Sequence, residues 1–177
     1  MIRLIRKIYE RRLERIVSSG KIPRHIMIVA DGDFLKNGLN MFLDWCDRFG
    51  IKEVTICLKS KEKRIEHTKY GSISVNFVIG YDGKEEILDA VRNLARLVER
   101  GEINPKNISE KDIERFLKIK SSPDLIVKAG REIPEFLIWQ SIYSELYFID
   151  MDWRSFRYID FLRCLREYQR RERRYGR

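Results

Sequence analysis

The chain is poor in the residues that mark disulfide-bonded, zinc-binding and disordered proteins. It has three cysteines, four prolines and ten glycines among 177 residues. Cys46, Cys57 and Cys164 are far apart and form no Cys-x-x-Cys pair, so the sequence predicts neither disulfides nor a zinc site. His25 and His67 also lack metal-ligand spacing and are interpreted as structural. We expect the three thiols in a core, because a composition of 44% hydrophobic and 36% charged residues is typical of a globular protein.

Long apolar runs are absent as well. The longest, such as residues 26–30 and 136–139, are far shorter than the roughly 20 residues that cross a bilayer. Residues 1–6 are interrupted by arginines and lack the apolar core and cleavage site of a secretory signal. We therefore expect no transmembrane helix and a cytoplasmic protein, with peripheral membrane contact as an open alternative.

Charge is plentiful and concentrated at the two ends. The net charge is +9, and residues 1–24 carry eight Lys and Arg against two Glu, while residues 154–177 carry nine Arg against three acids. Each end is thus +6, which leaves about −3 for the middle. Basic ends suit nucleic acid, diphosphate substrates or an anionic membrane surface, and charge alone does not choose between them.

The chain is expected to consist of a helical segment, residues 1–20, and one domain, residues 21–177. Apolar residues recur at helical spacing through residues 2–17, with Arg and Lys between them, and Gly20 ends the pattern. This basic amphipathic helix has two interpretations, because it could lie on an anionic membrane or pack on the domain. Packing is the preferred interpretation.

Strands and helices alternate through the domain. Strands are predicted at residues 25–30, 53–58, 73–79, 124–128 and 145–149, and residues 59–69 are interpreted as a charged connection. Helices are predicted at 39–49, 84–100 and 109–117, and from 155 onward.

Three of these helices carry a predicted N-terminal cap. The caps are Asn37, Ser109 and Ser155. The alternation of strands and helices indicates a single α/β domain with a mostly parallel central sheet flanked by helices. Ligands of such sheets bind beyond the carboxyl ends of the strands, so the turns at Asp31, Gly80, Lys128 and Asp150 are the candidate positions.

Five segments, taken in order, carry a family resemblance. They are residues 23–32 (PRHIMIVADG), 80–84 (GYDGK), 123–132 (PDLIVKAGRE), 144–148 (SELYF) and 171–176 (RERRYG). Each is similar to a block of the cis-prenyltransferases, the enzymes that extend an allylic diphosphate with isopentenyl diphosphate. The resemblance covers most of residues 23–176 and implies the fold of that family.

The resemblance also implies a metal site that binds Mg²⁺. Asp31 would act as the catalytic carboxylate that organises Mg²⁺ and the allylic diphosphate, and Glu145 would help to hold the metal, since carboxylates suit this hard cation. Without the resemblance, Asp31 could be a helix cap and Glu145 a solvated strand-end residue.

Further residues would bind the substrates if the resemblance holds. Gly32 and Lys128 match positions that face diphosphate groups, and Lys84 is a helix-start residue that is included as a weaker candidate. Arg131 is the candidate replacement for an arginine and a serine that the family uses on isopentenyl diphosphate. Arg174 and Gly176 match an Arg-x-Gly element that completes the isopentenyl site across a dimer. This predicts a homodimer, or a heterodimer with a full-length family member.

The chain departs from the family where substrates are held. Residues 33–36 (DFLK) replace the block Asn-Gly-Arg-Trp, and residues 59–63 (KSKEK) replace Ser-x-Glu-Asn-Trp. Three functions therefore stay open: an active prenyltransferase, a weakly active or noncatalytic subunit of a heteromeric enzyme, and a basic nucleic-acid-binding protein. The third has the least support, because no nucleic-acid motif accompanies the charge.

Overall fold

The computed structural model describes residues 2–30, 32–130 and 135–171. Its centre is one sheet in the order β3-β4-β2-β1-β5-β6, parallel except for the antiparallel edge strand β3. The strands are β1 (His25–Ala30), β2 (Glu53–Leu58), β3 (Arg64–Tyr70), β4 (Ile73–Ile79), β5 (Leu125–Ala129) and β6 (Glu145–Ile149). The predicted α/β fold with a mostly parallel sheet is confirmed.

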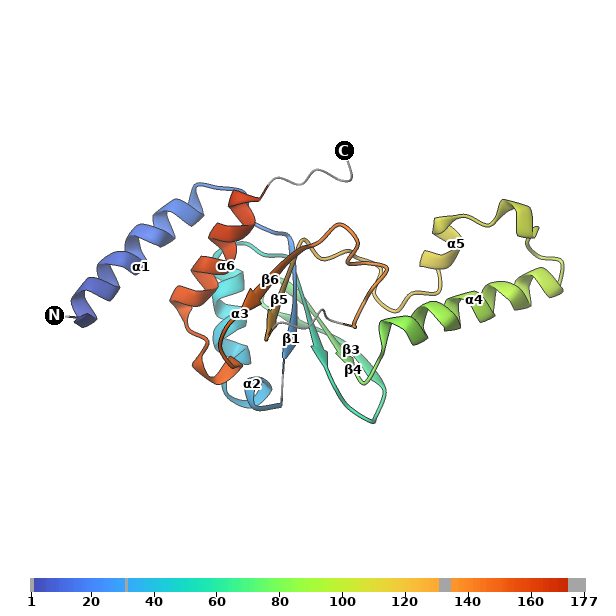
Figure 1. Ribbon diagram of the computed structural model, residues 1–177, viewed down its shortest axis with the longest axis horizontal. Coiled ribbons are helices and arrows are strands. Elements are labelled where there is room, and N and C mark those ends of the chain that lie inside the picture. The colour runs from blue at the N-terminus through green and yellow to red at the C-terminus, as the bar shows by residue number, and fades with distance from the viewer. Residues whose placement is uncertain (1, 31, 131–134, 172–177) are drawn as a thin grey trace.

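One face of the sheet is covered by helices and carries the larger core. Figure 1 shows α1, α3 and α6 together on this side. The covering elements are α1 (Ile2–Ser18), α2 (Gly32–Asn37), α3 (Leu39–Arg48), the 3₁₀ helix η2 (Trp153–Ser155) and α6 (Tyr158–Arg170). Ile26 and Ile28 of β1 meet Phe42 of α3 and Leu162 of α6 in this core. All three cysteines are buried, as predicted for core residues.

The other face carries a smaller core with a polar margin. Met27 and Val29 of β1 pack with Ile126 of β5 and with Phe136 and Leu137 of the β5–β6 connection. Since side chains alternate along a strand, His25 of β1 belongs to this same face, nearer the amino end of the strand. There the apolar cluster gives way to hydrogen-bonded polar side chains.

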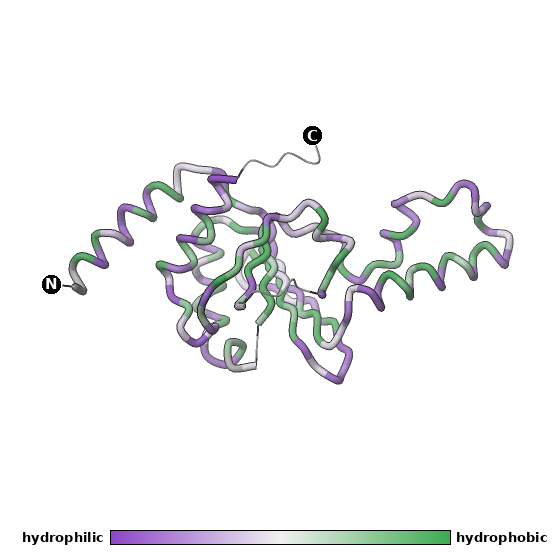
Figure 2. Tube along the Cα trace, viewed as in Figure 1, coloured by the Kyte–Doolittle hydropathy of each residue, from purple (hydrophilic) through white to green (hydrophobic). Residues whose placement is uncertain are grey.

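A two-helix arm extends from the sheet on the side away from α1 (Figure 1). It consists of α4 (Gly83–Glu99), the 3₁₀ helix η1 (Pro105–Asn107) and α5 (Glu110–Glu114). In Figure 2, hydrophilic and hydrophobic residues alternate along α1 and α4, as expected for helices with two different faces. None of the helices in the described ranges is long and apolar enough to span a membrane.

Four local predictions need correction. Residues 64–70 form strand β3, although 59–69 was expected to be a connection. Asn37 is not a cap but the last residue of α2, and Gly38 is the N-cap of α3. Ser155 ends η2, and Arg157 is the N-cap of α6. The third predicted helix ends at Glu114 rather than at residue 117.

Candidate functional site at the carboxyl ends of the strands

The carboxyl ends of β1, β2, β4, β5 and β6 lie side by side along one end of the sheet, its carboxyl edge, as parallel pairing requires. The register aligns Ala30 with Leu58 and Leu58 with Ile79. Asp31 follows β1 in the sequence but lies outside the described residues, as do Arg131, Arg174 and Gly176. Gly32 is exposed and begins α2 directly beyond the edge, with open space where a side chain would be.

A small pocket opens at this edge, between β2, β4 and the β5–β6 connection. Its volume is about 260 Å³, and its lining consists of Lys59, Ser60, Gly80, Tyr81, Asp82, Glu135 and Phe136. Gly80 has a positive φ of 68°, and a Cβ there would lie 2.1 Å from the carbonyl oxygen of Glu62. Glycine is therefore required to bring the turn after β4 so close to the turn after β2.

The pocket has charges of both signs, with Lys59 against Asp82 and Glu135 in its lining and further lysines at its rim. The ammonium groups of Lys63 and Lys118 lie 5.9 and 5.8 Å from the centre of the Tyr81 ring. Lys63 is also paired with Glu85, whereas Lys59 forms no ion pair within the described ranges. Cations near an aromatic face are attracted to its negative centre, so Tyr81 gathers positive charge at the pocket rim.

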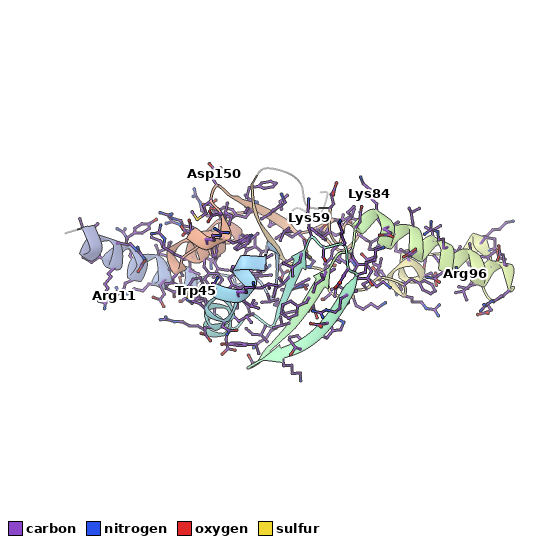
Figure 3. The ribbon with its side chains drawn as sticks, turned by 90° about the horizontal axis from the view of Figure 1, so that it is seen from below. Arg11, Trp45, Lys59, Lys84, Arg96 and Asp150 are labelled. Atoms are coloured by element: carbon purple, nitrogen blue, oxygen red, sulfur yellow. The ribbon has the colours of Figure 1, made fainter. Side chains whose placement is uncertain are left out.

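Two of the predicted substrate residues lie at the same end of the sheet as this pocket. Lys128 is aligned with Val29 of β1 and Phe148 of β6, one residue before the end of its strand. Alternation places its side chain on the same face as Ile126, the face of the pocket. Lys84 is exposed in the first turn of α4, and Figure 3 shows it near Lys59, where α4 meets the sheet. Neither lysine forms an ion pair with another described residue.

Asp82 fixes the start of α4 beside the pocket. Its side chain caps the helix by accepting a hydrogen bond of 2.8 Å from the backbone N–H of Lys84. The backbone N–H of Gly83 donates to the carbonyl of Glu135 at 2.7 Å. A Cβ at Gly83 would lie only 2.7 Å from that oxygen, so the second glycine of the Gly-Tyr-Asp-Gly segment is also sterically required.

Glu145 lies at the opposite end of the sheet, where the amino ends of the parallel strands lie side by side. It is the first residue of β6, aligned with Leu125 and hence level with Ile26. Ala30, the last residue of β1, is four residues further along, or about 13 Å at the rise of a strand. Glu145 is instead 3.5 Å from the guanidinium of Arg171. The structure thus does not bring Glu145 to the end of β1 that precedes Asp31.

The carboxyl edge offers few carboxylate ligands for a magnesium ion. Within the described part of the chain there is no group of three or more side chains that could hold a metal. Mg²⁺ usually takes one or two carboxylates and completes its shell with substrate phosphates and water. Asp31 could supply such a ligand. Asp150 is exposed after β6, and in Figure 3 it lies further from α4 than Lys59 does.

A second cavity flanks the end of β1 on the helical face. It measures about 440 Å³ and is lined by Phe34, Asn37, Gly38, Met41, Trp153, Arg154 and Phe156. The Trp153 indole donates a 2.7 Å hydrogen bond to the carbonyl of Val29, which holds η2 against the end of β1. The aromatic lining could take a hydrocarbon group.

Sequence reasoning missed Lys59, Ser60, Tyr81 and Phe136 as pocket residues. A usable signal was present, because Lys59 and Ser60 directly follow β2, whose last residue pairs with the last residue of β1. The rule that ligands bind beyond the carboxyl ends of strands would have included them. Phe136 had no such signal, since its connection enters the pocket from outside the sheet.

Solved structures with this architecture define the class of fold. The crystal structure of lavandulyl diphosphate synthase from Lavandula x intermedia, in complex with dimethylallyl diphosphate, superposes with a TM-score of 0.70. The match covers 88% of this chain and 99% of that one, at 21% identity. At this identity the likeness establishes the α/β fold of the cis-prenyltransferases and nothing more.

Sequence comparison is more specific. Residues 57–176 match a family described as putative undecaprenyl diphosphate synthase. The geranylgeranyl-diphosphate-specific tritrans,polycis-undecaprenyl-diphosphate synthase of Methanocaldococcus jannaschii is 46% identical over 131 residues, which are 71% of this chain and 46% of the relative. The protein of the same name from Methanopyrus kandleri is 30% identical over 246 residues, covering 97% and 91% of the two chains.

The chain belongs to the undecaprenyl diphosphate synthase family, that is, to the cis-prenyltransferases, a family of prenyl-transferring enzymes. It is a short member. It spans about half the length of the M. jannaschii relative that it matches. In the M. kandleri alignment at least 69 positions, the difference between 246 and 177, have no counterpart here.

Proposed function

We propose that the chain condenses isopentenyl diphosphate with an allylic diphosphate at the carboxyl edge of its sheet, giving a cis-prenyl diphosphate in a Mg²⁺-dependent reaction. The observation that carries the proposal is the pocket beside β2 and β4, at the end of the sheet where Lys59 and Lys128 form no ion pair with another described residue. Lysines beside an apolar wall can bind an anionic diphosphate that carries a hydrocarbon chain.

The proposed reaction needs no protein nucleophile. The allylic C–O bond breaks, and the diphosphate leaves with the electron pair while allylic carbocation character develops. The double bond of isopentenyl diphosphate attacks this carbon, a C–C bond forms, and a proton is lost to give a new double bond. Lys59 and Lys128 would stabilise the charge of the leaving diphosphate, and Gly32 would let it approach the backbone. A bound Mg²⁺, held by Asp31, would supply further charge neutralisation.

A second candidate function is that of a subunit in a heteromeric cis-prenyltransferase. Two observations favour it: the missing alignment positions and the placement of Glu145 at the far edge of the sheet. If Glu145 contributes to a metal site together with an Asp31-type carboxylate, two chains are needed. The Arg-x-Gly element at 174–176 would then serve the partner's site.

Incorporation of radiolabelled isopentenyl diphosphate tests both candidates. Purified chain is assayed with Mg²⁺ and short allylic diphosphates, alone and mixed with a full-length family member. Asp31→Ala and Lys128→Gln are the site variants, and Lys111→Gln, an exposed lysine of α5, is the matched control. We expect activity that both site variants lower at least about tenfold, the scale of one lost charge-assisted contact.

The outcomes separate the candidates. Activity of the chain alone supports the enzyme, and activity that rises only in the mixture, and falls when Arg174→Ala replaces the wild-type chain, supports the subunit. Absence of incorporation in both settings, with folded protein, contradicts both.

A further inference from the structure

Helix α1 exposes apolar side chains that the domain does not use. Leu13 and Val17 are fully buried against α6, which confirms packing of the C-terminal half on the domain. Ile5 and Ile8 are each 60% exposed, and Ile16 is 41% exposed. In Figure 1 the N-terminal half of α1 extends beyond the rest of the domain. These isoleucines have no partner within the chain as described.

A groove rich in arginine runs beside these isoleucines. Its volume is about 500 Å³, and it is lined by Arg11, Glu14, Arg15, Ser18, Ser19 and Arg48. The one acid of the groove, Glu14, is already paired with Arg48 of α3. Arg11 and Arg15 form no ion pair with any described residue. The groove therefore has two guanidinium groups available for an external anion.

The arginines and isoleucines occupy neighbouring stripes of the helix. Arg11 and Arg15 follow Ile8 by three and seven residues, the spacing that places side chains on one face. The whole helix has six basic residues against two acids, a net charge of +4. Apolar and cationic side chains are thus neighbours on the exposed side of α1, so an anionic lipid surface can contact both at once.

We propose that α1 docks on an anionic lipid surface. Ile5 and Ile8 enter the boundary between headgroups and acyl chains, while Arg11 and Arg15 bind headgroup phosphates. Charge complementarity selects this occupant. A second copy of α1 would place +4 against +4, and a nucleic acid would leave the isoleucines in water. In Figure 3, Arg11 lies at the opposite end of the molecule from Arg96 of α4, and Lys59 and Lys84 lie between them. The docking surface is therefore separate from the proposed reaction site.

Vesicle sedimentation tests the proposal with the full chain. The probes are vesicles of phosphatidylcholine with phosphatidylglycerol and vesicles of phosphatidylcholine alone. We expect binding to the first that salt weakens. Arg11→Gln with Arg15→Gln should raise the lipid concentration for half-binding about 30-fold. Each basic residue near an anionic surface strengthens binding about fivefold, and two are removed. Ile5→Ser with Ile8→Ser should raise it at least about tenfold.

Matched controls come from elsewhere on the surface. Lys61→Gln with Lys106→Gln removes the same charge, and Leu88→Ser with Val91→Ser removes two exposed apolar side chains of α4. Both controls should bind vesicles like the wild type. All four double variants alter exposed side chains, so their melting temperatures should be close to that of the wild type.

Three results would overturn the proposal. One is equal binding to vesicles with and without the anionic lipid. Another is wild-type binding by both α1 variants. The third is loss of binding only in the arginine variant together with tight binding of double-stranded RNA, which would identify a nucleic-acid surface. Since none of these readouts involves catalysis, the proposal stands or falls separately from the prenyltransferase function.

Discussion

At the scale of single residues, a network of hydrogen-bonded polar side chains lies on the second face of the sheet. The His25 Nε2 atom lies 2.7 Å from Thr55 Oγ1, and Asn76 Nδ2 donates to Thr55 Oγ1 at 3.1 Å and to Glu53 at 2.6 Å. His67 Nδ1 is 2.7 Å from Asn76 Oδ1. These bonds join β1, β2, β4 and β3 side by side. The structural interpretation of both histidines is consistent with this placement.

The network makes stability depend on pH through His25. Burial lowers the pKa of His25 below its ordinary 6.5, and nearby Glu53 offsets part of this effect. The folded chain therefore binds fewer protons than the unfolded chain at pH values between the lowered pKa and 6.5. We expect His25 to leave the free energy of unfolding unchanged above pH 6.5. As the pH decreases from 6.5, the free energy of unfolding should decrease by at most about 1.4 kcal/mol per pH unit.

Urea unfolding of the wild type and of His25→Gln across this pH range measures the effect. The variant is expected to be less stable overall but to lose the part of the slope that comes from His25. Equal slopes for the two proteins would contradict the assignment. His67→Gln removes the other imidazole, which is exposed on β3 but bonded to Asn76 of the same network, and so shows how much of any change comes from disturbing the network alone.

At the scale of elements, a buried carboxylate joins α4 to the segment that precedes β5. Glu86 is 4% exposed and accepts a 2.6 Å hydrogen bond from the backbone N–H of Lys118. Gln140, also buried, approaches the same carboxylate at 3.4 Å and donates to the carbonyl of Ile119 at 3.0 Å. Since Tyr81 and Phe136 of the pocket are close in sequence to Glu86 and Gln140, this contact also positions the candidate site.

Replacement of Glu86 should therefore loosen the pocket as well as the arm. Glu86→Ala leaves the Lys118 N–H unsatisfied and should lower the free energy of unfolding by about 1–3 kcal/mol. Limited proteolysis should show faster cleavage between residues 117 and 140. Glu99→Ala, at the exposed end of the same helix, should change stability by less than about 0.5 kcal/mol. Similar losses in both variants would refute a specific role for Glu86.

The elements also indicate how far sequence patterns reach. β2 and β6 agree with their predicted limits because they are short apolar runs bounded by turns. β3 was missed because Arg64, Glu66 and Lys69 give it no apolar face, and it is held by pairing with β4. Gly38 was missed as a cap because its role depends on Phe34, whose ring would lie 2.8 Å from a Cβ there. Such contacts between elements leave no pattern in the sequence.

The candidate site was only partly predictable for a related reason. The motifs identified Lys128 and Lys84, which lie at the same end of the sheet as the pocket but are not among its lining residues. The motifs did not predict that Glu145 lies at the amino end of its strand. Strand direction contains that information, since Glu145 begins β6 whereas Asp31 follows β1 in the sequence. Motif resemblance assigns roles, whereas parallel pairing decides which residues of one chain can meet.

At the scale of the whole molecule, exposed apolar residues before β6 bear on the proposed dimer. Ile142 and Tyr143 are each 62% exposed, and Phe148 of β6 is 38% exposed. Ile142 and Tyr143 are adjacent in the sequence, and neighbouring exposed apolar residues are candidates for a protein interface. We expect light scattering to give twice the mass of the chain at micromolar concentration, and Ile142→Asp to shift it toward the monomer. Leu88→Asp on α4 is the control, and a monomeric wild type would contradict the prediction.

The two outer strands of the sheet limit how copies of this chain can associate. β3 presents Arg64, Glu66 and Lys69 to solvent, and charged side chains on an edge oppose pairing with another strand. At the other margin, the guanidinium of Arg171 donates a 2.6 Å hydrogen bond to the carbonyl of Leu146 in β6. Charged side chains on the edge strand β3, and the arginine bound to edge strand β6, thus oppose the addition of further strands. The protein can concentrate basic and apolar side chains on its surface without becoming a template for fibrils.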